Sequence, residues 1–531
     1  MNHLQKSARF CSSHRYLLLF LGLGLAVRVA YLWVPSLEID GIQYCAMWSR
    51  NRLGFLLFNM LQGDVHPPLQ FLLSWIARAL LGERDWALSL PSVLLGTGAL
   101  GLLWLWAVRT RRGAAGLAAL GLVTFSLYHV YWSQHPRMYS LLIFCSIGLL
   151  WTVETLSSRS SRLHFFLFST FLFGALGTHF FGVMPAFAAF VFALVKLARS
   201  YYRDPPKVSG NFTIRLFYCL AVPMVLLMPW YGHFLLTLSG HGGSYEALQI
   251  QGAPLRVDFA FLKMLLGTYG FGTTWLFYLF LGFLALGVGR EVQKRRWSHL
   301  LFEAGWFLLP YAVVVTMPAA HFFDPSYTSS TAPVLWLWAG GGIAVVTVWC
   351  GRFLSFFRTR WGLTCAGLIV SLSVFAYPLS LYYRMGGKPT ALKQILRQIE
   401  SIAPEGQVLV FENPYDTRFF PVYYHPKKEV YFVDLGPMGV PGGRKGDLLA
   451  FFDSHPDAWL LQGSKMIEPQ DWADPWFSHK LVFCNISHEQ LFAMGLFPRP
   501  SNAPDPWVLH MGFRKSPSTQ KESVRFLESG S

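Results

Sequence analysis

The chain has 531 residues, of which 53% are hydrophobic, 17% aromatic and only 14% charged. This excess of apolar over charged residues is typical of a protein solvated by a lipid bilayer, and it excludes an ordinary water-soluble domain. The formal net charge of +16 comes from short basic clusters between hydrophobic runs, which is the pattern of positive-inside topology signals. We therefore expect a membrane protein and no nucleic-acid partner.

The first apolar run, near residues 16–34, follows Lys6, Arg9 and Arg15. A secretory signal peptide has a similar basic start, but no small-residue cleavage site of the A-x-A kind follows Val34. We predict a retained first span whose N-terminus is cytoplasmic.

The basic clusters predict the remaining topology, because cytoplasmic loops are enriched in Lys and Arg. The clusters lie within 109–112, 159–162, 196–207, 290–296 and 352–360. Placing all of them in the cytoplasm gives about eleven transmembrane helices, near 16–34, 88–108, 113–130, 138–155, 163–180, 182–199, 214–235, 273–289, 299–317, 331–350 and 362–381. An odd number of spans predicts an extracytoplasmic C-terminus.

The apolar stretch from Leu69 to Leu81 does not fit as a span. It is too short to cross the hydrocarbon core and it contains Arg78. We predict a juxtamembrane or re-entrant helix that begins at Pro67 and Pro68, because early helical positions need no donated N–H. Residues 35–87 then form one extracytoplasmic loop.

Ionisable residues of several loops converge on this same membrane face. They are Glu38, Asp40, Asp64 and His66 in the long loop, His135 and Arg137 in the loop within 133–139, His179, His241, and His321 and Asp324 in the loop within 321–327. Glu154 and Glu303 are exceptions, and we expect them near cytoplasmic helix ends where water can reach them.

From about Lys388 the sequence changes to a soluble α/β pattern. A helix is expected over 391–402, and short strands over 407–412, 429–434, 457–462 and 480–484. We predict a transmembrane domain over 1–387, a small extracytoplasmic α/β domain over 388–500 with a partly parallel sheet, and a loose polar tail over 501–531.

Such a constellation can belong to a transporter, to an enzyme acting on a lipid-linked substrate, or to a scaffold. Transporters usually place ionisable residues near the bilayer midplane and often have two related halves. In this sequence the charges fall at predicted helix ends and the halves differ. The pattern favours an enzyme whose substrate is held at the membrane interface.

Five motifs, in order, resemble the GT-C superfamily of integral-membrane glycosyltransferases, in the branch of protein O-mannosyltransferases and aminoarabinose transferases. The motifs are Glu38-Ile39-Asp40-Gly41, then Asp64-Val65-His66-Pro67-Pro68-Leu69, then Ala87-Leu88-Ser89-Leu90-Pro91-Ser92, then the segment from Tyr131 to Tyr139, then His179-Phe180-Phe181. Each motif alone is weak, but their order within an eleven-span frame is specific.

The resemblance implies transfer of a sugar from a polyprenyl-phosphate donor to a saccharide, lipid or protein acceptor, at the extracytoplasmic face of a bacterial inner membrane. Asp40 is the expected general base, with inversion at the anomeric carbon, and Glu38 is expected to assist it. In relatives a second acidic residue follows the Asp directly, whereas Gly41 follows Asp40 here.

The resemblance also implies a site for the donor phosphate. His66, Arg137 and His135 are the expected phosphate-binding residues, and Asp64, Gln134, Tyr139, His179 and Tyr327 are the other expected substrate-binding residues. Ser326 replaces the Arg that usually precedes the position of Tyr327. Simpler interpretations remain open, because His66 can be a helix-start residue and Arg137 an interfacial anchor.

Two other functions stay open as alternatives, namely a transporter or flippase of a lipid-linked saccharide and an inactive relative acting as a partner subunit. The seven cysteines show no CxxC or CxxH spacing, so they indicate neither a metal site nor a disulfide framework. A divalent metal as cofactor is left open.

Overall fold

The structure is a computed structural model. It describes residues 3–30, 32, 52–54, 57, 66–82, 84–156, 161–203, 210–236, 259–271, 275–316, 325–384, 399–404, 406–411, 430–433, 451–462, 477–484, 507–513 and 524–528. The chain divides into two compact units. The first contains residues 1–32, 51–379 and 493–498, and the second contains 33–50, 380–492 and 499–531.

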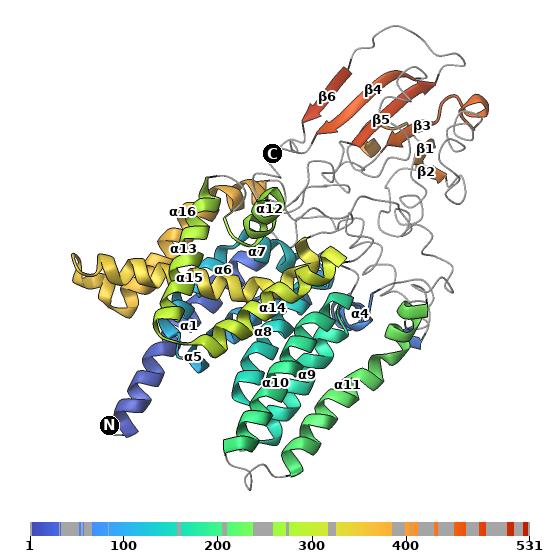
Figure 1. Cartoon of the computed structure of the whole chain (residues 1–531). Helices are drawn as coiled ribbons and strands as arrows, with labels where there is room; N and C mark the ends of the chain where they lie inside the picture. Colours follow the sequence, from blue (N-terminus) through green and yellow to red (C-terminus); the bar gives the residue numbers. More distant parts are fainter. Residues whose placement is uncertain are drawn as a thin grey trace. The chain divides into compact units, whose positions relative to one another are not determined.

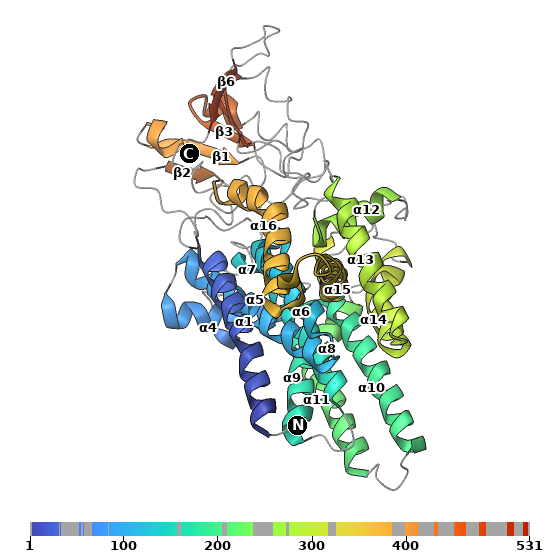
Figure 2. The same cartoon turned by 90° about the vertical axis from the view of Figure 1, so that its left-hand side faces the viewer.

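The first unit is a bundle of α-helices (Figures 1 and 2). Its α-helices are α1 (His3–Val29), α4 (Leu69–Leu81), α5 (Asp85–Arg109), α6 (Gly113–Phe125), α7 (Leu127–Gln134), α8 (Tyr139–Thr155), α9 (Arg162–Leu176), α10 (Val183–Arg203), α11 (Gly210–Leu236), α12 (Phe259–Tyr269), α13 (Leu276–Gln293), α14 (Trp297–Thr316), α15 (Ala332–Cys350) and α16 (Arg360–Arg384). In the described part of the unit, short 3-10 helices also occur, namely η2 (Phe180–Gly182), η7 (Pro325–Thr331) and η8 (Ser355–Arg358).

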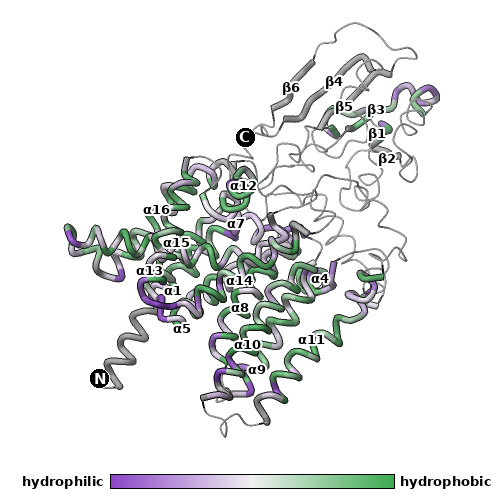
Figure 3. Tube along the Cα trace, in the orientation of Figure 1, coloured by the Kyte–Doolittle hydropathy of each residue, from purple (hydrophilic) through white to green (hydrophobic). Residues whose placement is uncertain are grey.

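Hydrophobic residues run along most of these helices, and hydrophilic residues gather at helix ends (Figure 3). Within the described residues, six helices are long and apolar enough to cross a membrane, or seven if a bent pair counts as one span. Every one of the eleven predicted spans overlaps a helix of the structure. The multispanning helical class is thus confirmed, while the number eleven stays a prediction.

Helix α15 packs between α6 and α13. Glycines allow these backbones to approach closely, since a side chain at Gly340 would overlap the backbone of α6, and one at Gly342 would overlap the backbone of α13. Small residues at helix contacts are the usual device for close packing within a membrane, where lipid tails offer no hydrophobic driving force.

Helix α4 has the predicted bounds, Leu69–Leu81, with Pro68 as its N-cap. Its 13 residues would rise about 20 Å, less than the roughly 30 Å of the hydrocarbon core. Gly82 ends the helix with a φ of +83°, a left-handed conformation that glycine adopts without steric cost, and its N–H bonds to the Arg78 carbonyl. The length of α4 is therefore that expected of a juxtamembrane or re-entrant helix.

The third predicted span, 113–130, is two helices in the structure. Helices α6 and α7 meet at Ser126 with a bend of 57°. The Ser126 side chain accepts a hydrogen bond from the backbone N–H of His129, so it caps α7. The bend leaves the last carbonyls of α6 without partners inside their own helix.

The second unit contains a six-stranded sheet with the order β2-β1-β3-β5-β4-β6. The strands are β1 (Gln407–Phe411), β2 (Val430–Val433), β3 (Trp459–Gln462), β4 (Phe477–Cys484), β5 (Trp507–Phe513) and β6 (Val524–Glu528). Strand β1 pairs parallel with β2 and β3, β5 pairs antiparallel with β3 and β4, and β6 pairs parallel with β4. The sheet is therefore mixed, as the sequence predicted when it indicated a partly parallel sheet.

The structure differs from the sequence expectation at the C-terminus. The segment over 501–531, expected to be a loose tail, supplies β5 and β6. In β5 the run Trp507-Val-Leu-His-Met-Gly-Phe513 has the apolar and aromatic content that favours a strand, and it pairs on both sides. Most of the helix expected over 391–402 lies outside the described residues.

Candidate functional site

Glu38, Asp40 and Asp64 lie outside the described residues. The same applies to His241, His321 and Asp324. The candidate-site residues that the structure describes are expected phosphate-binding and substrate-binding residues.

Five of the expected site residues form one cluster, which we call the His179 cluster: His66, Arg137, Tyr139, His179 and Tyr327. Each comes from the end of an element. His66 precedes α4, Arg137 and Tyr139 lie at the junction of α7 and α8, His179 joins α9 to η2, and Tyr327 lies in η7. Helix ends that are far apart in sequence thus meet at one end of the bundle.

His179 lies at the centre of the cluster. Its ring centroid is 5.6 Å from that of His66, 5.4 Å from that of Tyr327 and 5.9 Å from that of Tyr139. The guanidinium carbon of Arg137 lies 5.9 Å from the ring centroid of Tyr139, which is cation–π distance. His179 and Tyr139 are buried, whereas His66, Arg137 and Tyr327 are partly exposed.

The hydrogen bonding of His179 fixes which ring nitrogen bears a proton. The backbone N–H of Phe181 donates to Nδ1 of His179 at 3.1 Å, so Nδ1 is an acceptor. Burial, and then the charges of His66 and Arg137, lower the pKa of His179 well below its ordinary value. The imidazole is therefore neutral at pH 7, with its proton on Nε2 as a hydrogen-bond donor.

Tyr327 is held by its own segment and by neighbouring rings. It stacks on Phe181 at a centroid distance of 5.7 Å. Behind it, the hydroxyl of Thr328 bonds to that of Tyr269 at 2.8 Å, and the hydroxyl of Thr331 bonds to that of Tyr311 at 2.9 Å. These buried hydrogen bonds attach η7 to α12 and α14. The segment that carries Tyr327 is therefore fixed against two helices.

His135 lies in a different environment from the His179 cluster. It is buried, its ring packs on Tyr131 at 4.0 Å, and its Nδ1 donates to the Tyr131 carbonyl at 2.7 Å. Trp132 lies 6.0 Å from His135 and 4.2 Å from Tyr139, between centroids. Trp132 therefore contacts both His135 and a member of the cluster.

Gln134 bonds to the backbone of α1. Its side-chain amide donates to the carbonyls of Arg28 and Ala30, each at 2.9 Å, and to that of Val27 at 3.4 Å. These carbonyls belong to the last turn of α1, where no intrahelical donor remains. Gln134 therefore fixes the end of α1 from which the chain leads on to Glu38 and Asp40.

Arg28, in α1, was not among the residues expected to be important from the sequence. It is fully buried, and its guanidinium donates to the carbonyls of Val123 at 3.2 Å and Thr124 at 3.4 Å, and to the Ser133 hydroxyl at 3.2 Å. It thereby caps the carbonyls left open by the bend between α6 and α7, and a cation is favourable at a helix C-terminus. An arginine inside the apolar run of the first span was the signal that could have revealed it.

The His179 cluster offers groups that suit an anionic oxygen ligand. The Arg137 guanidinium can form paired hydrogen bonds to a phosphate, His179 presents an Nε2–H donor, and the tyrosine hydroxyls can donate or accept. Within the described part of the chain, no three His, Cys, Asp or Glu side chains are grouped so as to hold a metal ion.

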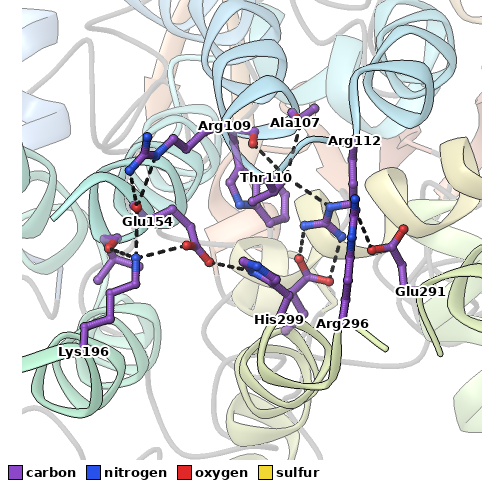
Figure 4. Close-up of polar contacts among 12 residues, drawn as sticks. Ala107, Arg109, Thr110, Arg112, Glu154, Lys196, Glu291, Arg296 and His299 are labelled. Carbon is purple, nitrogen blue, oxygen red and sulfur yellow. Dashed lines mark hydrogen bonds and ion pairs between the residues drawn. The ribbon is translucent and has the colours of Figure 1, made fainter. Parts of the chain in front are cut away.

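A second set of charged residues lies at the opposite helix ends, where α5, α8, α10 and α13 finish and α6 and α14 start (Figure 4). Arg112 forms an ion pair with Glu303, whose carboxylate also accepts a hydrogen bond from Trp338 at 2.7 Å. Glu154 accepts from Lys196 and from His299, each at 3.0 Å. Basic clusters that are remote in the sequence thus come together, as expected if all lie on one side of the membrane.

These contacts correct one expectation. Glu154 and Glu303 were expected at water-accessible helix ends, but both are buried, and Glu303 is only 1% exposed. A buried carboxylate is costly unless it is paired and hydrogen-bonded, and each of these has cationic and hydrogen-bonding partners. The two carboxylates therefore connect helices rather than face water.

Comparison with protein-family models gives one match. Residues 65–228 match the family described as dolichyl-phosphate-mannose-protein mannosyltransferase. This region includes every residue of the His179 cluster except Tyr327. A comparison with curated proteins gives no match.

Comparison with solved structures gives matches of low sequence identity. ArnT from Cupriavidus metallidurans bound to undecaprenyl phosphate has a TM-score of 0.51 and 15% identity, covering 84% of this chain and 93% of that one. The apo state has the same score and identity and covers 89% and 96%. The oligosaccharyltransferase of Archaeoglobus fulgidus in the apo form has a TM-score of 0.47 and 11% identity, covering 85% and 69%.

The family match and the similarity to ArnT confirm the resemblance to the GT-C superfamily that the motif order suggested. The chain has the GT-C fold and is similar to the integral-membrane glycosyltransferases of that superfamily.

Proposed function

We propose that this protein transfers a sugar from a polyprenyl-phosphate donor to a saccharide, lipid or protein acceptor at the extracytoplasmic face of a bacterial inner membrane. The observation that supports this most strongly is the His179 cluster, in which residues of three separate motifs lie together with Tyr327. Its chemistry suits a phosphate, and the similar ArnT structure is described as bound to undecaprenyl phosphate.

In this proposal the cluster holds the phosphate that leaves on the lipid. Arg137 and His66 would face the growing negative charge, and the Nε2–H of neutral His179 would add a fixed donor. Donors that are held in place before the reaction stabilise a transition state most effectively. The hydrogen bond from the Phe181 N–H to Nδ1 holds the ring of His179 in this way.

Asp40 is the proposed general base. It would accept the proton of the acceptor hydroxyl as the hydroxyl oxygen attacks the anomeric carbon. The bond to the phosphate oxygen breaks on the opposite face, so the configuration inverts. Glu38 would assist by raising the basicity of Asp40, because Gly41 supplies no second carboxylate.

We further propose that eleven helices span the membrane, that the N-terminus is cytoplasmic, and that the face bearing the His179 cluster is periplasmic. The grouping of the basic residues at the opposite helix ends supports this orientation.

Binding of undecaprenyl phosphate to the purified protein tests the donor site. The wild type should bind it, and Arg137→Gln should bind it at least about tenfold more weakly, because a charge-assisted hydrogen bond contributes about 1.5–3 kcal/mol. Arg162→Gln, at the first residue of α9, is a control at the other helix ends. Equal affinity in Arg137→Gln and wild type would count against the proposed phosphate site.

A further inference from the structure

A groove of about 390 Å³ lies between α10 and α14, outside the His179 cluster. Its floor contains the stacked rings of Phe192 and Phe302, whose centroids are 3.9 Å apart, and the buried Trp306. Its walls include the exposed side chains of Val191 and Leu301. The volume is in the range of ordinary ligand pockets, and the lining is that of an acyl-chain site.

One end of the groove is polar. Arg199 and Ser298 line it there, one turn from the end of α10 and at the second residue of α14. Among the residues that the structure describes, none forms an ion pair with Arg199, whereas nearby Lys196 pairs with Glu154. Within the described part of the chain, Arg199 therefore offers a positive charge that no carboxylate neutralises.

Aromatic residues indicate the depth of this end in the membrane. Trp297, next to Ser298, and Tyr202, one turn after Arg199, are both exposed. Exposed Trp and Tyr at helix ends are enriched at the level of the lipid headgroups. The Arg199 end of the groove therefore lies at headgroup depth, and the apolar part extends toward the membrane interior.

We propose that this groove is a binding site for an anionic phospholipid, with one acyl chain on Phe192, Phe302 and Trp306 and the headgroup phosphate on Arg199 and Ser298. Basic pockets between transmembrane helices on the cytoplasmic side are suited to anionic headgroups. The site is separate from the proposed transferase site, and its test does not depend on that activity.

Gly305 provides a selective way to fill the groove. It lines the groove, and a Cβ at this position would meet no atom within 4 Å. Gly305→Leu would therefore occupy the space of the acyl chain without disturbing the protein. Gly289, on α13, also has no atom near its Cβ position and does not line the groove, so Gly289→Leu is the matched control.

The experiment is a titration of the full-length protein in mild detergent, followed by native mass spectrometry. The probes are phosphatidylglycerol and phosphatidylcholine with identical acyl chains. We expect at least about tenfold tighter binding of phosphatidylglycerol to the wild type, because its headgroup has a net negative charge, whereas the choline ammonium of phosphatidylcholine offsets the phosphate and is repelled by Arg199. Arg199→Gln should abolish this preference, and the control Arg162→Gln should keep it.

Gly305→Leu should weaken binding of the bound lipid by at least about tenfold, whereas Gly289→Leu should not change it. Equal binding of the two probes to the wild type, or equal effects of the two glycine substitutions, would overturn the proposal. Displacement of phosphatidylglycerol by stoichiometric undecaprenyl phosphate in the wild type, but not in Arg199→Gln, would also overturn it, because the groove would then hold the carrier lipid.

Discussion

The side-chain amide of Gln134, the last residue of α7, donates a hydrogen bond of 2.9 Å to the backbone carbonyl of Arg28 in the last turn of α1. In return, Arg28 donates to Ser133 and to the last carbonyls of α6. The two residues thereby fasten the end of α1 to the bend between α6 and α7. The bend leads on to Arg137, the proposed phosphate ligand, so the anchor joins the end of α1 to the helix junction that carries this residue.

The first prediction concerns this anchor. Gln134→Leu keeps the size of the side chain and removes the donor to the Arg28 and Ala30 carbonyls. We expect kcat to fall by up to about 100-fold, because a misplacement of about 1 Å can cost that much, while the affinity for undecaprenyl phosphate changes little. Steady-state kinetics and lipid binding measure the two effects separately.

Gln134→Glu extends the same test, because a carboxylate cannot donate hydrogen bonds to carbonyls. We expect this substitution to lower kcat at least as much as Gln134→Leu does. Wild-type kcat in both variants would refute the anchoring role.

The second prediction separates the two nitrogens of His179. In His179→Asn a side-chain oxygen can still accept from the Phe181 N–H, because Asn is a good cap, but the Nε2–H donor is lost. We expect near wild-type thermal stability and a rise in KM for the donor. His179→Phe loses both functions and should also lower the melting temperature. If His179→Asn unfolds as readily as His179→Phe while retaining full activity, the assignment is wrong.

The third prediction is a pH dependence. The pKa of His179 is lowered in the folded protein by burial and by His66 and Arg137, while in the unfolded chain it is about 6.5. Between these two values the unfolded state binds more protons, so the free energy of unfolding decreases as pH falls below about 6.5. His179→Asn should lessen this decrease when unfolding is followed from pH 7.5 to 5. An identical slope in wild type and variant would show that the ring is not kept neutral.

The fourth prediction concerns the buried pair of Arg112 and Glu303. Glu303→Leu leaves the guanidinium buried without its partner, so we expect a loss of about 3–5 kcal/mol in stability. Adding Arg112→Met removes the stranded charge and should recover much of that loss. Thermal unfolding of the two variants and of wild type measures this. No recovery in the double variant would mean that Arg112 has further essential partners.

Much of the first unit was predictable because bilayer crossing imposes long apolar runs and basic flanks. The bounds of α4 followed from the length of its apolar stretch and from Pro68. The bend at Ser126 was not predicted, because the stretch 113–130 is apolar enough overall to be interpreted as one span, and Arg28, which bonds to the carbonyls at the end of α6, is remote in sequence.

For the site, motif order selected His66, Arg137, Tyr139 and His179, and the family resemblance added Tyr327, before their contacts were known. Sequence alone did not show that His179 is central, because its neighbours in the cluster come from three other helix ends. The burial of Glu154 and Glu303 was also missed, since a carboxylate near a helix end looks solvent-exposed until its partners are placed.

The most direct test of the proposed function is the release of free undecaprenyl phosphate from an undecaprenyl-phosphate sugar as the sugar passes to the hydroxyl of an added acceptor or of water. The proteins compared are purified wild type, Asp40→Asn and Asp457→Asn. Asp457 lies exposed in the second unit, so Asp457→Asn is the control. We predict release by the wild type and the control, and a rate lower by about 10²–10⁴ in Asp40→Asn, which is the usual contribution of a general base. Release by Asp40→Asn at the wild-type rate would contradict the proposed mechanism.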